Sequence, residues 1–210
     1  MPKRKSTVGG IILAAGNSSR MGEPKQLLPF GELNFLQHAV SIGTEAGLEP
    51  LVVVLGANAS KMRRELLKYP VQMVINRDWQ TGMGSSIQVG IKALRQLAPT
   101  LKAAAIMLCD QPLIDAAYIK QLVAAYKKSP KEIVASRYSG EPNGRTIGAP
   151  ALFSCELFDE LEQLSGDEGA RHIIRNHLTD VELLDCPHGL LDVDTPEAYS
   201  QLMQQTQAAV

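Results

Sequence analysis

The 210-residue sequence has few cysteines, and they are not spaced for a zinc ribbon. Cys109, Cys155 and Cys186 contain no C-x-x-C pair, which excludes a disulfide framework of the kind that holds small secreted domains together. The basic and apolar residues 2–16 imitate a signal peptide, but the apolar run is at the short end for that role. We therefore predict reduced thiols and a cytoplasmic location.

Neither sign of charge is in excess, and long apolar runs are missing. The 21 Lys and Arg residues nearly balance the 22 Asp and Glu residues, so nucleic acid is not an expected partner. No apolar stretch reaches the roughly 18 residues that a membrane span requires. A small phosphorylated ligand that binds to a local charge cluster is compatible with both absences.

Repeats, low-complexity segments and evident linkers are also missing, which predicts a single domain over residues 1–210. What the chain does contain is an alternation of short apolar runs with longer amphipathic ones. The predicted strands are residues 10–14, 51–56, 71–75, 103–108, 132–136 and 181–184. The first five are almost continuously apolar, as expected when helices cover both faces of a mostly parallel sheet. We predict a three-layer α/β/α fold of the doubly wound type.

The predicted helices have apolar residues at 3.6-residue spacing. One carries Met83, Ile87, Ile91, Leu94 and Ala98 on one face, and a later one carries Ile119, Leu122, Val123 and Tyr126. Asn58 is a candidate N-cap for a helix with Met62, Leu66 and Leu67. After a loop over residues 138–145, we predict helices at 155–164 and 169–177. A last helix is expected with Thr195 as its N-cap and Pro196 at its first position.

Unusual polar loops follow the predicted strands, at residues 16–25, 76–86 and 110–112. In open α/β sheets, ligands bind outside the carboxyl ends of the strands. In the first loop, the small residues 14–16 allow backbone N–H groups to approach an anion, while Ser18, Arg20 and Lys25 add donors and positive charge. The loop contains neither G-x-x-x-x-G-K-[ST] nor G-x-G-x-x-G, so an ordinary surface loop is the alternative.

Three aspartates are candidate ligands for Mg²⁺, which prefers carboxylate oxygens. Asp110 ends a predicted strand, although it could instead cap the following loop. Asp192 and Asp194 lie on one face if their segment is extended, although Asp192 could be a turn residue and Asp194 could serve the last helix dipole. We favour Asp110 and Asp194 as the metal ligands.

Asp167 and Arg171 are four residues apart, which permits either a helical salt bridge or an anion site at a helix N-terminus. The four histidines, His38, His172, His177 and His188, show no ligand spacing, and we assign none of them a role.

The segment L-A-A-G-N-S-S-R-M-G-E-P-K, residues 13–25, resembles the signature of nucleotidyltransferases with a glycosyltransferase-A-like fold. Four further segments resemble the enzymes that attach CMP or GMP to molybdopterin, in the order of that family. They are G-M-G-S-S at 82–86, C-D-Q-P at 109–112, G-D-E-G-A-R at 166–171 and D-V-D-T-P-E at 192–197. The resemblance covers nearly the whole chain. It divides the chain into a basic tail (1–7), a nucleotide-binding half (8–136) and an acceptor-binding elaboration (137–210).

This resemblance implies CTP, Mg²⁺ and a molybdopterin-type acceptor, with a molybdoenzyme or its maturation chaperone as a further partner. The segments 13–16 and 82–86 are similar to the cytidylyl members, whereas guanylyl members have L-A-G-G and a G-P-L-A-G-like segment there. The residues that it assigns to the nucleotide are Leu13, Ala14, Ala15, Gly16, Ser18, Gly82, Met83 and Ser85. It places Asp167, Arg171 and Asp192 at the acceptor, Asp110 and Asp194 on the metal, and Lys25 and Arg20 at the phosphates as catalytic residues.

Three alternatives remain open. The nucleotide could be GTP, or the acceptor could be another small phosphorylated molecule, as in the methylerythritol-phosphate and sugar-phosphate nucleotidyltransferases that share the first motif. A protein of a different class, a cofactor-binding chaperone that has lost catalysis, would keep the same fold.

Overall fold

The computed structural model describes residues 7–138, 146–167, 169–186 and 193–208. A seven-stranded sheet runs through it in the order β5-β4-β1-β6-β8-β7-β9. Its strands are β1 (Val8–Ala14), β4 (Leu51–Leu55), β5 (Gln72–Ile75), β6 (Ala103–Leu108), β7 (Ile133–Tyr138), β8 (Thr146–Ser154) and β9 (Val181–Asp185). All neighbouring strands pair in parallel except β8, which is antiparallel to both β6 and β7. A separate hairpin pairs β2 (Pro29–Phe30) with β3 (Leu33–Asn34).

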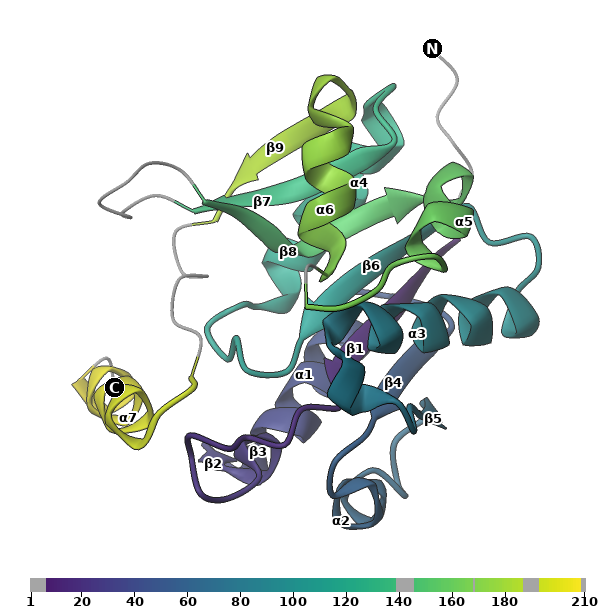
Figure 1. Cartoon of the computed structure of the whole chain (residues 1–210). Coiled ribbons are helices and arrows are strands. Elements are labelled where there is room, and N and C mark those ends of the chain that lie inside the picture. The colour runs from purple at the N-terminus through teal and green to yellow at the C-terminus, as the bar shows by residue number, and fades with distance from the viewer. Residues whose placement is uncertain (1–6, 139–145, 168, 187–192, 209–210) are drawn as a thin grey trace.

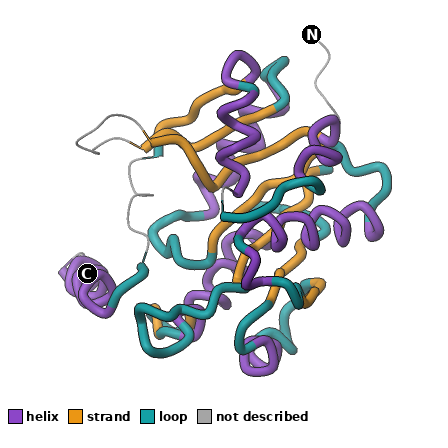
Figure 2. The backbone as a smooth tube through the Cα atoms, in the orientation of Figure 1, coloured by secondary structure: helices purple, strands orange, loops and turns teal. Residues whose placement is uncertain are grey.

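Helices cover both faces of the sheet (Figures 1 and 2). They are α1 (Phe35–Glu45), α2 (Ala59–Glu65), α3 (Met83–Leu97), α4 (Ala116–Lys128), α5 (Phe158–Leu161), α6 (Gly169–Asn176) and α7 (Pro196–Ala208). Short 3-10 helices connect other elements in the described part of the chain: η1 (Lys25–Leu27), η2 (Trp79–Thr81), η3 (Cys155–Leu157) and η4 (Leu178–Asp180). Among the described residues, no helix has the length and apolar character needed to cross a bilayer.

Two hydrophobic cores follow from the alternation of side chains along each strand. On β1, Ile12 and Ala14 pack with α1, α2 and α4, while Ile11 and Leu13 pack with α3, α5 and α6 on the opposite face. The central strands are buried on both faces, which explains their continuous apolar sequence. The two cores hold the carboxyl ends of β1 and β6 at one edge of the sheet.

A third, smaller cluster lies away from the sheet and holds α7. Its buried members are Met21, Leu28, Phe35, Val193 and Leu202. The hydroxyl of Tyr199 on α7 donates to the carbonyl of Pro29 at 2.8 Å, which ties α7 to the β2–β3 hairpin. Figure 1 shows α7 beside this hairpin, apart from the helices that cover the sheet. The segment that precedes α7 is therefore held against the loop that follows β1.

The predicted mostly parallel α/β architecture is confirmed, and the predicted strands differ from the observed ones only at their ends. Strand β8 (Thr146–Ser154) was not predicted, nor was the β2–β3 hairpin. The predicted helix at 155–164 is wrong in extent, because only η3 and α5 form there. The helix assigned to Leu66 and Leu67 ends at Glu65.

The caps show why local rules succeed or fail. Thr195 caps α7 as predicted, since its hydroxyl accepts from the N–H of Ala198 at 3.3 Å. Asn58 has the predicted N-cap position of α2, but its backbone is left-handed (φ 55°) and its side chain makes no capping hydrogen bond. Met83 begins α3 with 42% of its surface exposed, so it does not extend the buried stripe of that helix.

Leu202→Ala is expected to release α7 locally rather than to unfold the sheet. Truncation of a buried leucine costs about 2–5 kcal/mol, and the third cluster has few other apolar members to compensate. Hydrogen–deuterium exchange of residues 196–206 should accelerate, while β1 and β6 keep the protection of the wild type. Leu67→Ala, at a 70% exposed position, is the control. Equal acceleration in β1 and α7 would contradict a separate docking of α7.

Candidate active site

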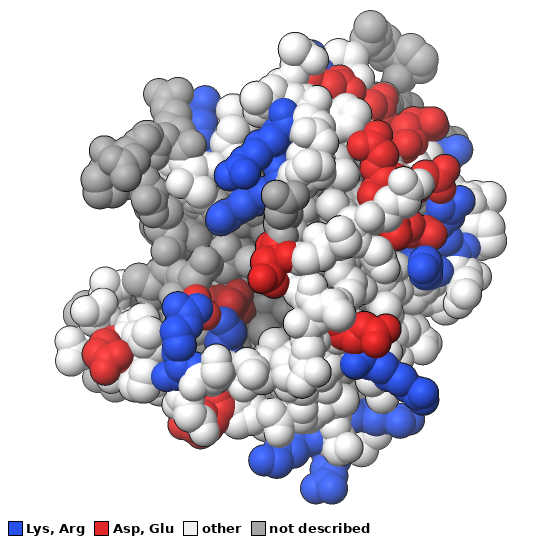
Figure 3. All heavy atoms as spheres, in the orientation of Figure 1, with Lys and Arg blue, Asp and Glu red and all other residues white. Residues whose placement is uncertain are grey.

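A cleft of about 630 Å³ opens at the carboxyl ends of β1 and β6. This volume falls in the range of small-molecule sites. Its walls are formed by residues 13–17, 108–110 and parts of 79–86, together with Lys25, Gln26 and Asp167. The three polar loops that were predicted to mark a site therefore meet in one cleft. In the space-filling view, basic and acidic side chains gather next to one another around the hollow between the positions of α7 and α3 (Figure 3).

Lys25 is the centre of the charged groups in this cleft. Its Nζ donates to Asp110 Oδ2 and to Asp194 Oδ1, each at 2.5 Å. Arg20 adds a second cation, since its Nη2 lies 2.7 Å from Asp194 Oδ2. The side chain of Lys25 is only 13% exposed, whereas that of Arg20 is 69% exposed. Lys25 is thus the inner, fixed cation, and Arg20 is the outer one.

The pKa shifts follow from this arrangement. Burial alone would lower the pKa of Lys25, but the charge and hydrogen bonds of Asp110 and Asp194 raise it above its ordinary value. Burial would likewise raise the pKa of Asp194, but Lys25 and then Arg20 lower it. Lys25 and Asp194 are therefore both charged at neutral pH. The side chain of Lys25 thus contributes a fixed positive charge to the cleft.

Asp110 and Asp194 come from distant parts of the chain. Asp110 directly follows Cys109 at the end of β6, and Asp194 precedes α7. The N–H of Val193 donates to the carbonyl of Asp110 at 3.1 Å, and Val193 is buried in the third cluster. This contact brings the two carboxylates together. Asp192 lies outside the described residues.

The two carboxylates suit a hard divalent cation. Because each oxygen lies 2.5 Å from the same nitrogen, they are no more than about 5 Å apart. No group of three or more His, Cys, Asp or Glu side chains that could enclose a metal occurs in the described part of the chain. Mg²⁺ and Mn²⁺ commonly use few carboxylates and complete their shell with water and phosphate oxygens. The donor set therefore fits a metal that is shared with a phosphorylated ligand.

The turn after β1, residues 14–18, is called the phosphate turn here after its predicted role, and hydrogen bonds of its own and neighbouring side chains close it. Ser18 has a left-handed backbone (φ 56°), and its hydroxyl accepts from the N–H of Lys25 at 3.0 Å. Gly16 lines the cleft, whereas Ser18 does not. Gln26, which sequence reasoning missed, is 1% exposed and also lines the cleft. No sequence signal distinguishes it, since it reads as one polar residue in K-Q-L-L.

The second wall forms where α3 begins. Gly82 has φ 113°, and a Cβ there would come within 2.3 Å of the carbonyl oxygen of Gly166. Glycine is therefore required for the loop that carries Asp167 to approach α3. Gly82, Met83 and Asp167, which the resemblance assigns to ligand binding, all line the cleft.

The hydroxyl of Ser85, in contrast, is engaged by hydrogen bonds within the protein and does not line the cleft. It donates toward the carbonyls of Gly82 and Asp78 and accepts from the amide of Asn76 at 2.8 Å. Its neighbour Ser86, rather than Ser85, lines the cleft. Asn76 is 2% exposed and also donates to Ser86 Oγ at 3.0 Å. The buried amide of Asn76 thus fixes the first turn of α3.

Asp167 and Arg171 are not brought onto one helix face. Asp167 precedes α6, while Arg171 lies on it against Gly148 of β8, where a Cβ would come within 3.2 Å of the Arg171 Nε. Arg171 is exposed and lies outside the lining of the cleft. Of the predicted acceptor residues in the described part of the chain, Asp167 alone lines the cleft.

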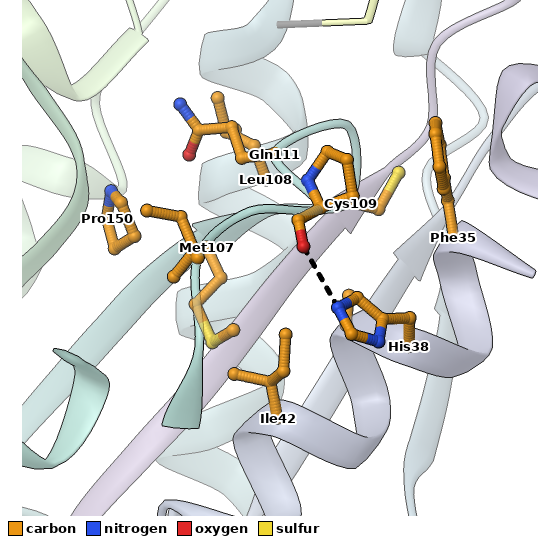
Figure 4. Close-up of a pocket in the computed structure, with 11 residues that line it drawn as sticks. Phe35, His38, Ile42, Met107, Leu108, Cys109, Gln111 and Pro150 are labelled. Atoms are coloured by element: carbon orange, nitrogen blue, oxygen red, sulfur yellow. Dashed lines mark hydrogen bonds between the residues drawn. The ribbon is translucent and has the colours of Figure 1, made fainter. Parts of the chain in front are cut away.

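His38 holds the turn that carries Asp110. The Nε2–H of His38, on α1, donates to the carbonyl of Pro112 at 3.0 Å, as Figure 4 shows. The ring of Phe30 contacts that of His38 edge-on, with the centroids 4.8 Å apart. The neighbouring Cys109 is buried, and burial raises the pKa of its thiol, which disfavours the reactive thiolate form.

Comparisons with known proteins point to one protein family. A model of the MobA-like NTP transferase domain matches residues 10–181. The nicotine blue oxidoreductase of Paenarthrobacter nicotinovorans is 33% identical over 93% of this chain and 96% of its own length. The purine catabolism protein PucB of Bacillus subtilis is 27% identical over 92% of this chain and 94% of its own.

The solved structures agree with this match. That of Rv0371c from Mycobacterium tuberculosis superimposes with a TM-score of 0.81 at 30% identity, covering 97% of this chain and all of that one. A second structure of Rv0371c was determined as a complex with manganese and has a TM-score of 0.76 at 30% identity, covering 95% of this chain and 99% of that one. A CMP-2-keto-3-deoxy-manno-octonic acid synthetase complexed with CTP has a TM-score of 0.75 and covers 98% of this chain and all of that one. At 11% identity it shows the fold alone.

His38 should make the stability of the protein depend on pH. Burial lowers its pKa below 6.5, and the hydrogen bond to Pro112 offsets this only in part. Since the unfolded chain binds the proton more readily, the free energy of unfolding should fall as the pH falls from about 6.5 through the lower folded pKa. Urea unfolding of wild type and His38→Gln between about pH 7.5 and pH 5.5 measures the effect. Glutamine keeps an N–H donor but does not titrate, so the variant should lose less stability. Identical pH dependence would contradict the assignment.

Proposed function

The chain belongs to the MobA-like NTP transferase domain family, and we propose that it transfers CMP from CTP to the phosphate of a molybdopterin-type cofactor, with release of pyrophosphate. The single observation that carries nucleotidyl transfer is the junction of Lys25, Asp110 and Asp194 in the cleft beside the phosphate turn. Two carboxylates and a buried ammonium at a strand-end turn are the groups that a metal–triphosphate ligand needs.

The choice of CTP has narrower support. The segments 13–16 and 82–86 resemble the cytidylyl members, and Gly82 and Met83 form a wall of the cleft. GTP is the alternative, because a probable molybdenum cofactor guanylyltransferase of Opitutus terrae is also similar, at 29% identity over 74% of both chains. The molybdopterin-type acceptor follows from the resemblance of the segments 109–112, 166–171 and 192–197.

In the proposed reaction, a phosphate oxygen of the acceptor attacks the α-phosphorus of CTP. The bond from that phosphorus to the bridging oxygen breaks, and pyrophosphate leaves. The attacking group is already an anion, so the side chains need to position and neutralise charge rather than to remove a proton. Lys25 and Arg20 stabilise the charge that builds on the phosphates. The backbone N–H groups of the phosphate turn, that of Gly16 included, bind the phosphates.

Asp110 and Asp194 would hold Mg²⁺, which when bound supplies positive charge against the phosphate oxygens. In the free protein, Lys25 neutralises these carboxylates, and the same ammonium is available to the phosphates. Asp167 lines the cleft, and we assign it to the acceptor. Arg171, which does not line the cleft, and Asp192 are also proposed to bind the acceptor.

The relative named as an oxidoreductase raises a second candidate activity, a redox reaction on the same fold. The phosphate turn lacks the G-x-G-x-x-G fingerprint of dinucleotide-binding enzymes, which argues against that activity. A cofactor-binding chaperone is the third reading, and the joint presence of Lys25, Asp110 and Asp194 argues for catalysis instead.

Pyrophosphate release distinguishes these readings. With Mg²⁺ and molybdopterin, each of CTP, GTP, ATP and UTP is assayed in turn, and we expect release with CTP. Release with GTP alone would overturn the choice of nucleotide. The absence of release with all four would overturn nucleotidyl transfer.

Lys25→Met and Asp110→Asn should each lower the turnover number about 10²–10³-fold, because each removes a charge at the reacting phosphates. Both proteins should keep the circular dichroism spectrum of the wild type. Lys120→Met is the matched control, since Lys120 is an exposed lysine that pairs with Glu45 on the surface. Wild-type turnover in either active-site variant would contradict the assigned roles.

A further inference from the structure

Gln26 is a buried polar side chain in the wall of the cleft. It lies in η1, next to Lys25, and only 1% of its surface is exposed. A buried amide must satisfy its hydrogen bonds within the protein, and an unsatisfied one costs stability. The partners of Gln26 therefore show what its position is for.

Among the described residues, the side-chain hydrogen bonds of Gln26 are all to the phosphate turn. Its Nε2 donates to the carbonyl of Gly16 at 2.8 Å and, at 3.5 Å, to that of Ala14. Its Oε1 accepts from the hydroxyl of Ser18 at 3.2 Å. The same hydroxyl accepts from the N–H of Lys25 at 3.0 Å. Gln26 and Ser18 thus form a hydrogen-bond network that joins the phosphate turn to Lys25.

The contact to Gly16 fixes the direction of the next N–H group. The carbonyl of Gly16 and the N–H of Asn17 belong to one planar trans peptide, in which they point in opposite directions. Because Gln26 holds the carbonyl, the Asn17 N–H is directed away from Gln26. None of the hydrogen bonds among the described residues uses the N–H of Gly16, Asn17 or Ser18. These donors remain available to an anion.

We infer that Gln26 is a positioning residue for the triphosphate. Both of its donor hydrogens and its acceptor are engaged by the turn, so it acts on the ligand through the backbone of residues 14–18 rather than by contact. Its effect is on the phosphate chain and not on the base. This inference rests on the proposed function only in that the anion is taken to be a nucleoside triphosphate.

A double-mutant cycle tests the network. Gln26→Met keeps the volume and removes the hydrogen bonds, while Ser18→Ala removes the hydroxyl from the other end, at a half-buried position that does not threaten the core. Isothermal titration with two probes, CTP with Mg²⁺ and inorganic tripolyphosphate with Mg²⁺, separates phosphate from base. We expect Gln26→Met to raise both dissociation constants about tenfold. The double variant should have dissociation constants close to those of Gln26→Met, because the first substitution already breaks the shared network.

Gln121→Met is the matched control, because Gln121 is exposed on α4, on the far side of the sheet from α3. This variant should bind both probes like the wild type. Wild-type affinity of Gln26→Met for both probes, or weaker binding of CTP with unchanged tripolyphosphate binding, would overturn the inference. Independent, additive losses would overturn the network. A wild type that binds tripolyphosphate but not CTP would contradict the proposed transfer from CTP, and weaker tripolyphosphate binding by Gln26→Met would still support the role of Gln26. Binding of neither probe would overturn both.

Discussion

One ammonium group between two carboxylates organises this molecule. Lys25 lies 2.5 Å from an oxygen of Asp110 and from one of Asp194, and without it these two negative charges would lie within about 5 Å of each other and repel. The three residues come from the turn after β1, the end of β6 and the segment before α7. Their charges are only partly exposed, so solvent screens them less than it screens a surface pair. The folding of three separate segments is thereby linked to one cluster of charge.

The surrounding structure keeps these charges in place from both sides. His38 and the N–H of Val193 hold the turn of Asp110, and the third cluster holds the segment of Asp194 through α7. Gln26 connects the phosphate turn to the segment of Lys25. These supports use backbone carbonyls and apolar contacts rather than further charges. A phosphate ligand with its metal can therefore replace the ion pairs of Lys25 with Asp110 and Asp194 while these supporting contacts stay unchanged.

Much of the fold and the core of the site could be predicted from the sequence. Continuous apolar strands and polar strand-end loops indicate a parallel sheet with its site at one edge, and Lys25 and Asp110 are charged residues in those loops. Asp194 lies outside them, in the segment before α7. Strand β8 was missed because Gly148 and Pro150 interrupt it in a sequence that reads as a loop. Gln26 and His38 act through carbonyls that only the tertiary structure brings to them. For the same reason, the sequence could not show that Ser85 bonds to its own turn or that Arg171 lies outside the cleft lining.

The central claim is that Asp110 and Asp194 form one cation-binding centre with the triphosphate. Electron paramagnetic resonance of free Mn²⁺, titrated with protein in the presence of CTP, measures it most directly. We predict that the wild type depletes the free Mn²⁺ signal, and that Asp110→Asn and Asp194→Asn each weaken Mn²⁺ binding at least about tenfold, since each removes a ligand charge. Wild-type Mn²⁺ affinity in both variants would contradict it.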